Sequence, residues 1–214
     1  MKPLSSYIDH TILKPEAKYE DIKKVCEEAL EYNFKAVCIN PLYVKYSSEM
    51  LKNSDVLVAT VVGFPLGNNR SEVKKLETEL AVKDGADEID MVINIPALKN
   101  KEYDIVKQDI KEVVKSADGK TVKVILETCL LKDEEIKKAC QLSLEGGADF
   151  VKTSTGFSTG GAEISDVKLM KSVVKDKMKI KASGGIRNKE KALEMIEAGA
   201  DRIGASSSIK IVEG

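Results

Sequence analysis

Gly147-Ala148-Asp149 stands directly before a short apolar run, Phe150-Val151-Lys152, which ends in Thr153-Ser154-Thr155-Gly156. The same Gly-Ala-Asp triplet occurs at residues 85–87 and 199–201, each time between a predicted helix and a predicted strand. Glycine readily adopts the left-handed conformation that ends a helix, and a small alanine lets helix and strand pack closely. The triplet therefore indicates a repeated unit of one strand and one helix.

The hydrophobic pattern along the chain predicts eight such units. Right-handed βαβ units repeated eight times close naturally into a (β/α)8 TIM barrel, so we expect one α/β domain over residues 1–214. A doubly wound open sheet is the alternative, but its Gly-x-Gly-x-x-Gly fingerprint does not follow the first strand. Strands are expected at 6–11, 36–40, 57–64, 88–95, 122–128, around Lys152, around Lys181 and at 202–207; helices are expected at 19–33, 41–51, 71–83, 103–116, 132–144, 163–175 and 188–198.

Apolar residues recur at helical spacing in several predicted helices, such as Ile22, Val25, Ala29 and Leu30 in 19–33 and Val73, Leu76 and Leu80 in 71–83. Periodicity alone does not separate apolar helix residues that pack on a core from those that lie on the surface. The oligomeric state is therefore not fixed by this pattern.

Composition argues against several classes of function. The 214 residues carry a net charge of -1, which gives no basic surface for nucleic acid. No apolar run approaches the ~20 residues of a membrane span, and the N-terminus lacks a signal-peptide core, so we expect a cytoplasmic protein with no membrane partner. Cys26, Cys38, Cys129 and Cys140 form no Cys-x-x-Cys pair, and His10 is the single histidine, so we expect no metal site.

A lysine within an apolar strand needs an explanation, and we select two such lysines as candidates. Lys152 lies in the run quoted above, and Lys181 lies in Lys179-Ile180-Lys181-Ala182-Ser183. If these are neighbouring strands ~4.8 Å apart, the two amines influence each other strongly, and desolvation or a second cation lowers a lysine pKa until the free amine is a usable nucleophile. The alternative for either lysine is a solvated surface position, since the chain has 34 Lys and Arg residues.

Residues 88–95 alternate between an apolar face, with Ile89, Met91 and Ile93, and a polar face that includes Asp90. In a barrel, Asp90, Lys152 and Lys181 would point into one cavity at the C-terminal ends of the strands. Loops after the last strands form the usual phosphate site of this fold. Gly156, Gly184, Gly185, Gly204, Ser206 and Ser207 have the right composition and position, although ordinary turns are the alternative.

Four segments in this order closely resemble the deoxyribose-phosphate aldolase family: Ile8-Asp9-His10-Thr11, Glu88-Ile89-Asp90-Met91-Val92, Val151-Lys152-Thr153-Ser154-Thr155-Gly156 and Lys181-Ala182-Ser183-Gly184-Gly185-Ile186. The resemblance implies a Schiff-base aldolase that needs no cofactor and reversibly cleaves 2-deoxy-D-ribose 5-phosphate to acetaldehyde and D-glyceraldehyde 3-phosphate. It implies that Lys152 forms the imine, Lys181 is the nearby cation and Asp90 moves protons. A homodimer is also expected from the family.

Further residues are candidates for substrate contact. Asp9 and Thr11 could bind substrate hydroxyls and Cys38 could line the pocket, with a buried apolar role as the alternative for Cys38. Glu127 could orient Lys152. Two other functions stay open: another barrel enzyme acting on a sugar phosphate, such as an isomerase or a different lysine aldolase, and a sugar-phosphate binder without catalysis.

Overall fold

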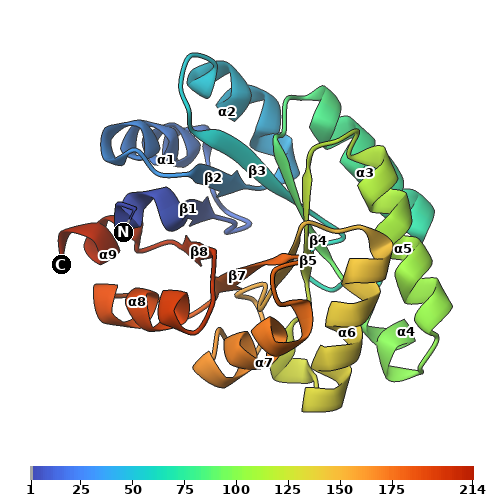
Figure 1. Cartoon of the computed structure of the whole chain (residues 1–214). Coiled ribbons are helices and arrows are strands. Elements are labelled where there is room, and N and C mark those ends of the chain that lie inside the picture. The colour runs from blue at the N-terminus through green and yellow to red at the C-terminus, as the bar shows by residue number, and fades with distance from the viewer. Residues whose placement is uncertain (1) are drawn as a thin grey trace.

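A computed structural model describes residues 2–214, in which eight parallel strands close into a barrel (Figure 1). The strands are hydrogen-bonded in chain order, and the last pairs with the first. The predicted TIM barrel is confirmed. The strands are β1 (Ile8–Ile12), β2 (Ala36–Ile39), β3 (Leu57–Val62), β4 (Glu88–Val92), β5 (Thr121–Ile125), β6 (Phe150–Lys152), β7 (Lys179–Ser183) and β8 (Arg202–Ala205).

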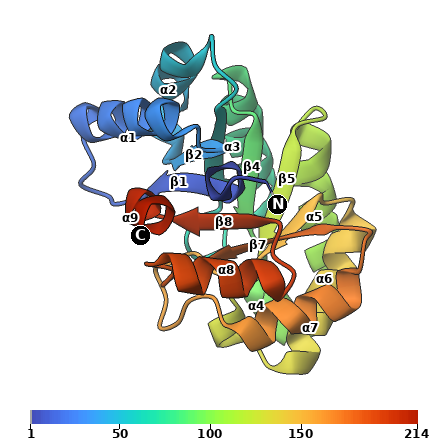
Figure 2. The ribbon, with the colours of Figure 1, turned by 60° about the vertical axis from the view of Figure 1, so that its left-hand side comes forward.

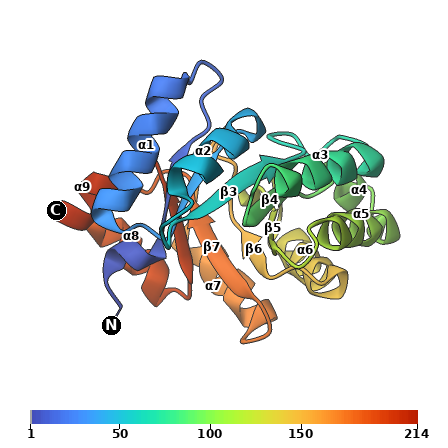
Figure 3. The same cartoon turned by 90° about the horizontal axis from the view of Figure 1, so that it is seen from above.

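Helices surround the strands, as the view from above shows (Figure 3). None of the helices in residues 2–214 is both long and apolar enough to cross a membrane. The α-helices are α1 (Tyr19–Tyr32), α2 (Val44–Leu51), α3 (Ser71–Lys83), α4 (Ile95–Lys99), α5 (Tyr103–Ser116), α6 (Asp133–Gly146), α7 (Ile164–Val174), α8 (Lys189–Glu197) and α9 (Ser208–Glu213); the 3-10 helices are η1 (Leu4–Tyr7), η2 (Pro41–Tyr43) and η3 (Thr128–Leu130).

Five strands (β2, β3, β4, β5 and β8) end before their predicted last residues, and the difference is largest for the fourth and the fifth. The fourth ends at Val92, because Asn94 caps α4 by accepting a hydrogen bond from the Ala97 amide at 3.1 Å and Pro96 suits the first helical turn. The fifth ends at Ile125, and Thr128 begins a 3-10 helix instead of ending a strand. Both corrections lie at C-terminal strand ends, where the chain turns toward the site.

The Gly-Ala-Asp triplets do more than end helices. Their glycines have positive φ, and their aspartate side chains each accept a hydrogen bond from a backbone amide of the preceding strand in the barrel. Asp149 accepts from Val122 at 2.8 Å, and Asp201 accepts from Ile180 at 2.9 Å. Asp87 accepts from Val58 at 3.1 Å. The repeat therefore also fixes where neighbouring strands start relative to each other.

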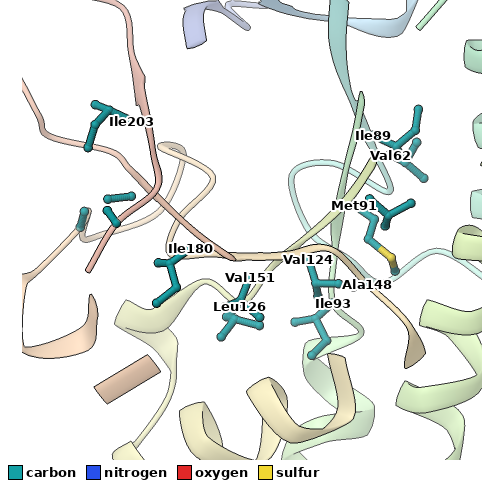
Figure 4. Packing of buried hydrophobic residues seen from close by; sticks show 14 of the residues in the cluster. Val62, Ile89, Met91, Ile93, Val124, Leu126, Ala148, Val151, Ile180 and Ile203 are labelled. Carbon is teal, nitrogen blue, oxygen red and sulfur yellow. The ribbon is translucent and has the colours of Figure 1, made fainter. Parts of the chain in front are cut away.

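The apolar core lies between the outside of the barrel and the helices. Strand alternation sends Val124, Val151 and Ile180 toward the helices, as Figure 4 shows, and each of them is fully buried. Burial of this layer, at about 25 cal/mol per Å² of apolar surface, supplies the main stabilisation. The opposite face of the same strands is left to point into the barrel.

Helix α3 departs from this pattern. Its largest apolar residues, Val73, Leu76 and Leu80, are 48%, 55% and 51% exposed. Lys74 is instead fully buried beneath α3, where its Nζ binds Asp109 Oδ2 at 2.5 Å and the Val92 carbonyl at 2.9 Å. Val73, Leu76 and Leu80 are therefore surface residues.

The first and last described elements, η1 and α9, lie on one side of the barrel. Helix α9 packs against β1 and η1, beside β8 (Figure 2). Tyr32 of α1 donates a hydrogen bond to Glu213 of α9 at 2.5 Å. This packing places the start of α9 next to the loop that follows β8.

Candidate active site

A cavity of about 730 Å³ opens at the C-terminal ends of the strands. Its wall comes from the segments that follow β1, β6, β7 and β8. The sequence-predicted residues that line it are Thr11, Lys152, Gly156, Gly184, Gly185, Gly204, Ser206 and Ser207.

Lys152 ends β6 and points inward, with Val151 before it packed on the outer layer. Its side chain is 3% exposed, and its Nζ donates to Asp90 Oδ2 at 2.9 Å. Lys152 lines the cavity, whereas Asp90 is fully buried and lies behind it. The amine is thus reachable from the cavity and held from behind by a carboxylate.

Lys181 is the neighbour of Lys152 in the register of β6 and β7. Its Nζ donates to the same Asp90 oxygen at 2.8 Å and forms an ion pair with Asp9 Oδ2 at 2.5 Å. Burial lowers the pKa of Lys181, but the Asp9 and Asp90 carboxylates outweigh burial and raise this pKa above its ordinary value. Lys181 is therefore a fixed cation beside Lys152.

The structure adds three buried ions that the sequence analysis did not select. Lys123 Nζ binds Asp90 Oδ1 at 2.7 Å and Glu88 Oε2 at 2.6 Å. Arg202 reaches both oxygens of Glu88 at 3.0 Å and Asp9 Oδ1 at 2.6 Å. We call the resulting group the barrel ion network; its members are Asp9, Glu88, Asp90, Lys123, Lys152, Lys181 and Arg202.

A sequence signal for these missed residues exists. Lys123 stands between Val122 and Val124 in an apolar strand, the same setting that singled out Lys152. Glu88 lies on the polar face of residues 88–95 with Asp90, and Arg202 begins β8. A charged residue at an inward strand position was the common feature.

The carboxylates of the network keep their charge. Burial raises the pKa of Asp90, but Lys123, Lys152 and Lys181 together hold it well below its usual range. Burial likewise raises the pKa of Asp9, and Lys181 and Arg202 more than offset this, which lowers the pKa to about 2. Both carboxylates are therefore weak bases that stay ionised and bind the neighbouring cations.

The charges of the network do not balance when every group is ionised. Three carboxylates face four cationic groups. Lys123, Lys181 and Arg202 each touch two carboxylates, whereas Lys152 touches one, Asp90, through an oxygen that it shares with Lys181. An uncompensated buried charge is costly, so the network is best balanced when Lys152 carries none.

Asp9 and Cys38 do not line the cavity, contrary to the expectation of substrate contact. Asp9 precedes Thr11 by two residues in β1, is fully buried, and forms ion pairs with Lys181 and Arg202. Cys38 is fully buried in an apolar cluster with Ala59 and Val61, and burial raises its thiol pKa. Both are fully buried and are absent from the cavity lining.

Glu127 has a different partner from the one expected. Its carboxylate accepts hydrogen bonds from the hydroxyl and, at 3.2 Å, the backbone amide of Thr155. Glu127 therefore fixes the loop after Lys152, and the residue that holds the Lys152 amine is Asp90.

The C-terminal ends of β7 and β8 approach each other closely. A Cβ on Gly204 would lie 2.9 Å from Ser183 Cβ and 3.1 Å from Lys181 Cε, so only glycine fits there without displacement. The Ser183 hydroxyl donates to the Ser154 carbonyl at 2.6 Å, which joins the end of β7 to the segment after β6. Residues that end or follow β6, β7 and β8 thus line one cavity.

His10 links this side of the cavity to helix α1. Its Nδ1 lies 2.9 Å from the Ser208 hydroxyl, and its Nε2 lies 2.7 Å from Glu28 Oε2. Ser208 in turn donates to the Ala205 carbonyl at 2.9 Å. The histidine therefore holds the segment between β8 and α9, which contains Ser206 and Ser207.

Comparison with known proteins gives one consistent result. Residues 4–211 match the DeoC/LacD family of aldolases. The chain is 62% identical over 211 residues to the deoxyribose-phosphate aldolase of Finegoldia magna, covering 99% of both chains, and 61% identical over 217 residues to that of Thermococcus kodakarensis, covering 100% and 97%. A solved deoxyribose phosphate aldolase from Aeropyrum pernix, described as having a unique tetrameric structure, superimposes with a TM-score of 0.92 at 38% identity, covering 98% of this chain and 89% of that one.

Proposed function

Since this chain belongs to the DeoC/LacD family of aldolases, we propose that it cleaves 2-deoxy-D-ribose 5-phosphate reversibly to acetaldehyde and D-glyceraldehyde 3-phosphate. The relatives named above carry the name of this activity and are about 60% identical over almost their whole length. The observation that carries the proposal is the Lys152 amine at the cavity wall, held by a network that is balanced when this amine is neutral.

The neutral Lys152 amine attacks the substrate aldehyde carbon, and loss of water gives an iminium ion. The iminium accepts the electron pair released when the bond between carbons two and three breaks, and the three-hydroxyl proton leaves to a base. Glyceraldehyde 3-phosphate departs and an enamine of acetaldehyde remains on Lys152. Protonation of the enamine carbon and attack by water then release acetaldehyde and restore the amine.

Asp90 is the proton-moving group of this proposal, and Lys181 is a cation that keeps Asp90 ionised. Asp90 Oδ2 lies within hydrogen-bond distance of both lysine nitrogens, so it joins the reacting amine to a permanent cation. Because the pKa of Asp90 is so low, the carboxylate passes on any proton that it accepts instead of retaining it. A water molecule from the cavity supplies the matching proton, while Lys181 keeps its own proton.

The phosphate is proposed to lie against the loops after β6, β7 and β8. Gly156, Gly184, Gly185, Gly204, Ser206 and Ser207 line that side, and backbone amides suit a phosphate without adding a charge. Thr11, which also lines the cavity, is in position to contact a substrate hydroxyl. Asp9 acts on the substrate only indirectly, by holding Lys181.

Product analysis tests the reaction. Purified protein incubated with deoxyribose 5-phosphate should release acetaldehyde and glyceraldehyde 3-phosphate in equal amounts. Lys152→Arg should abolish both products, because a guanidinium cannot form the imine, whereas Lys179→Arg, at an exposed position of β7, should not. An isomerised sugar phosphate, or binding without turnover, would instead support one of the alternative functions.

Two further parts of the proposal concern the setting of the enzyme. A homodimer is proposed as the assembly, while the tetramer is a property of the Aeropyrum pernix protein. A cytoplasmic location stays a prediction from the sequence.

A further inference from the structure

Glu127 is a buried carboxylate with an unusual backbone conformation. It follows the last residue of β5 by two positions, is 2% exposed and has left-handed backbone angles, with φ 57° and ψ 62°. Residues other than glycine adopt this conformation rarely, and such residues cluster at functional sites. The amide before Glu127 donates to the Lys152 carbonyl at 2.9 Å, and the amide after it donates to the Thr153 carbonyl at 3.0 Å. The backbone of Glu127 is therefore fastened to the segment that carries the reacting lysine.

The side chain of Glu127 binds Thr155 through both carboxylate oxygens. Oε1 accepts a hydrogen bond from the Thr155 amide at 3.2 Å, and Oε2 accepts one from the Thr155 hydroxyl. The thiol of Cys129 lies 3.9 Å from Oε1. Since none of these partners carries a positive charge, the hydrogen bonds to Thr155 are the main compensation for burying the Glu127 carboxylate.

These contacts fix the direction in which the Thr155 hydroxyl can bond. A hydroxyl has one proton to donate and two lone pairs that accept. The Thr155 proton goes to Glu127, and one lone pair accepts the Phe157 amide at 3.0 Å. Thr155 is 7% exposed and lines the cavity. Toward a molecule in the cavity, its oxygen can therefore accept a hydrogen bond but has no proton left to donate.

The chemistry of the reaction decides which substrate oxygen suits such an acceptor, and this step rests on the proposed function above. Thr155 lies in the chain between Lys152, which would hold carbon one, and Gly156, on the phosphate side, so it would meet the middle carbons. Oxygen three is a hydroxyl in the sugar phosphate but a carbonyl oxygen in D-glyceraldehyde 3-phosphate, where it has no proton to donate. Oxygen four is a hydroxyl in both molecules and can donate to Thr155 at every stage.

We propose that Glu127 is a positioning residue that holds Thr155 as a hydrogen-bond acceptor for hydroxyl four of the substrate. The carboxylate keeps the Thr155 proton out of the cavity. The site then selects an aldehyde with a hydroxyl on the carbon next to its carbonyl group, and it disfavours an oxygen without a proton at that place. Glu127 itself does not touch the substrate.

Glu127→Gln should reverse the role of the Thr155 hydroxyl. A glutamine side chain has one oxygen and one NH2 group. The Thr155 amide can only donate, so it takes the glutamine oxygen, and the NH2 group then faces the Thr155 hydroxyl oxygen. This oxygen accepts from the NH2 group and from the Phe157 amide, so its own proton turns to the cavity. Thr155 changes from an acceptor to a donor with no change in the size of either side chain.

Two three-carbon phosphates report this change in calorimetric titrations. sn-Glycerol 1-phosphate has the configuration of D-glyceraldehyde 3-phosphate and carries a hydroxyl on its middle carbon, whereas dihydroxyacetone phosphate carries a carbonyl oxygen there. The wild type should bind the first about tenfold more tightly than the second, because a carbonyl oxygen cannot donate to Thr155. Glu127→Gln should lower this ratio of dissociation constants at least about fivefold, mainly through tighter binding of dihydroxyacetone phosphate.

Three variants separate this role from a purely structural one. Thr155→Ser keeps the hydroxyl and should keep the wild-type ratio, whereas Thr155→Val should bring the ratio to about one. Cys129→Ser is the matched control, since Cys129 is exposed and lies beside the same Glu127 oxygen, and it should leave the ratio unchanged. A role of Glu127 in folding alone would weaken the binding of both phosphates equally.

Thermal unfolding shows which variants are folded. An unchanged ratio in folded Glu127→Gln overturns the proposal, and so does equal binding of the two phosphates by the wild type. If Glu127→Gln does not fold, the same ratio for Thr155→Val and Thr155→Ser overturns it. Failure of the proposed function is distinct, because it shows as a wild type that releases no acetaldehyde from deoxyribose 5-phosphate, and it would overturn this inference too.

Discussion

Lys123→Met is the sharpest perturbation of the barrel ion network. Lys123 is fully buried, lies outside the cavity lining and touches Asp90 and Glu88, so it does not contact substrate. Methionine keeps most of the side-chain length but removes the charge. Three carboxylates then face three cations, and the network is balanced with Lys152 protonated.

The size of the effect follows from the geometry around Asp90. Lys123 and Lys152 bind the two oxygens of this carboxylate at 2.7 and 2.9 Å. Two charges about 6 Å apart interact by about 3 kcal/mol at an effective dielectric constant of about 20, which corresponds to about two pH units. The acidic limb of the kcat/KM profile should therefore move to higher pH by about two units, with about a hundredfold lower kcat/KM on that limb.

The assay is the pH dependence of deoxyribose 5-phosphate cleavage, with thermal unfolding to define where each variant is folded. Lys123→Met/Glu88→Gln removes one positive and one negative charge, which restores the single excess cation of the wild type. The pH profile of this double variant should return most of the way to that of the wild type. An unchanged profile for Lys123→Met, or the same shifted profile for both variants, would refute the charge-balance reasoning.

Three further predictions concern stability, packing and the phosphate side. Asp9→Asn should destabilise the fold at pH 7 by about 2 kcal/mol, since the pKa of Asp9 falls from 3.8 to about 2 on folding. A carboxyl pKa that is lowered on folding stabilises the fold fully above pH 3.8, and this contribution is lost as the pH falls through about 2. The free energies of unfolding of the two proteins, measured with denaturant, should therefore converge below pH 3.8. A difference in unfolding free energy that does not change with pH would contradict this origin. Gly204→Ala should lower kcat at least about tenfold by displacing Lys181 or Ser183, which steady-state kinetics with a crystal structure of the variant would check. Glu28→Gln should loosen His10 and raise KM for the phosphorylated substrate more than for deoxyribose itself; equal changes for both would argue against a link to the phosphate loops.

The barrel could be predicted because the features of its repeat depend only on residues that are close together in the sequence. A glycine that ends a helix, an alanine at the junction and an apolar strand recur together three times, and each is a short-range feature of the chain. The further role of Asp87, Asp149 and Asp201 in binding the preceding strand depends on the register between strands, which periodicity does not specify.

The site was predicted in part for the same reason. Lys152, Lys181 and Asp90 stood out as charged residues at inward strand positions, and the structure brings them together. Lys123 has the same feature, but its importance arises only when β4, β5 and β8 close around Glu88 and Asp90. The absence of Asp9 and Cys38 from the cavity lining also depends on barrel stagger and not on strand alternation.

Helix α3 shows a different limit of sequence interpretation. Helical spacing identified Val73, Leu76 and Leu80 as one face, but spacing does not tell which face meets the barrel. The Lys74 and Asp109 pair decides this, and the two residues are 35 positions apart in the chain. A buried lysine under a helix with an exposed apolar face is visible only in three dimensions.

The central claim is that Lys152 is the amine that forms a covalent imine with the substrate aldehyde. Incubation with acetaldehyde and borohydride, followed by digestion and mass spectrometry, tests this directly because reduction makes the imine permanent. One ethyl group on the peptide that contains Lys152, absent in Lys152→Arg and retained in Lys179→Arg, is the predicted result. Modification at Lys181 or Lys123 instead, or turnover without any reduced adduct, would contradict the account.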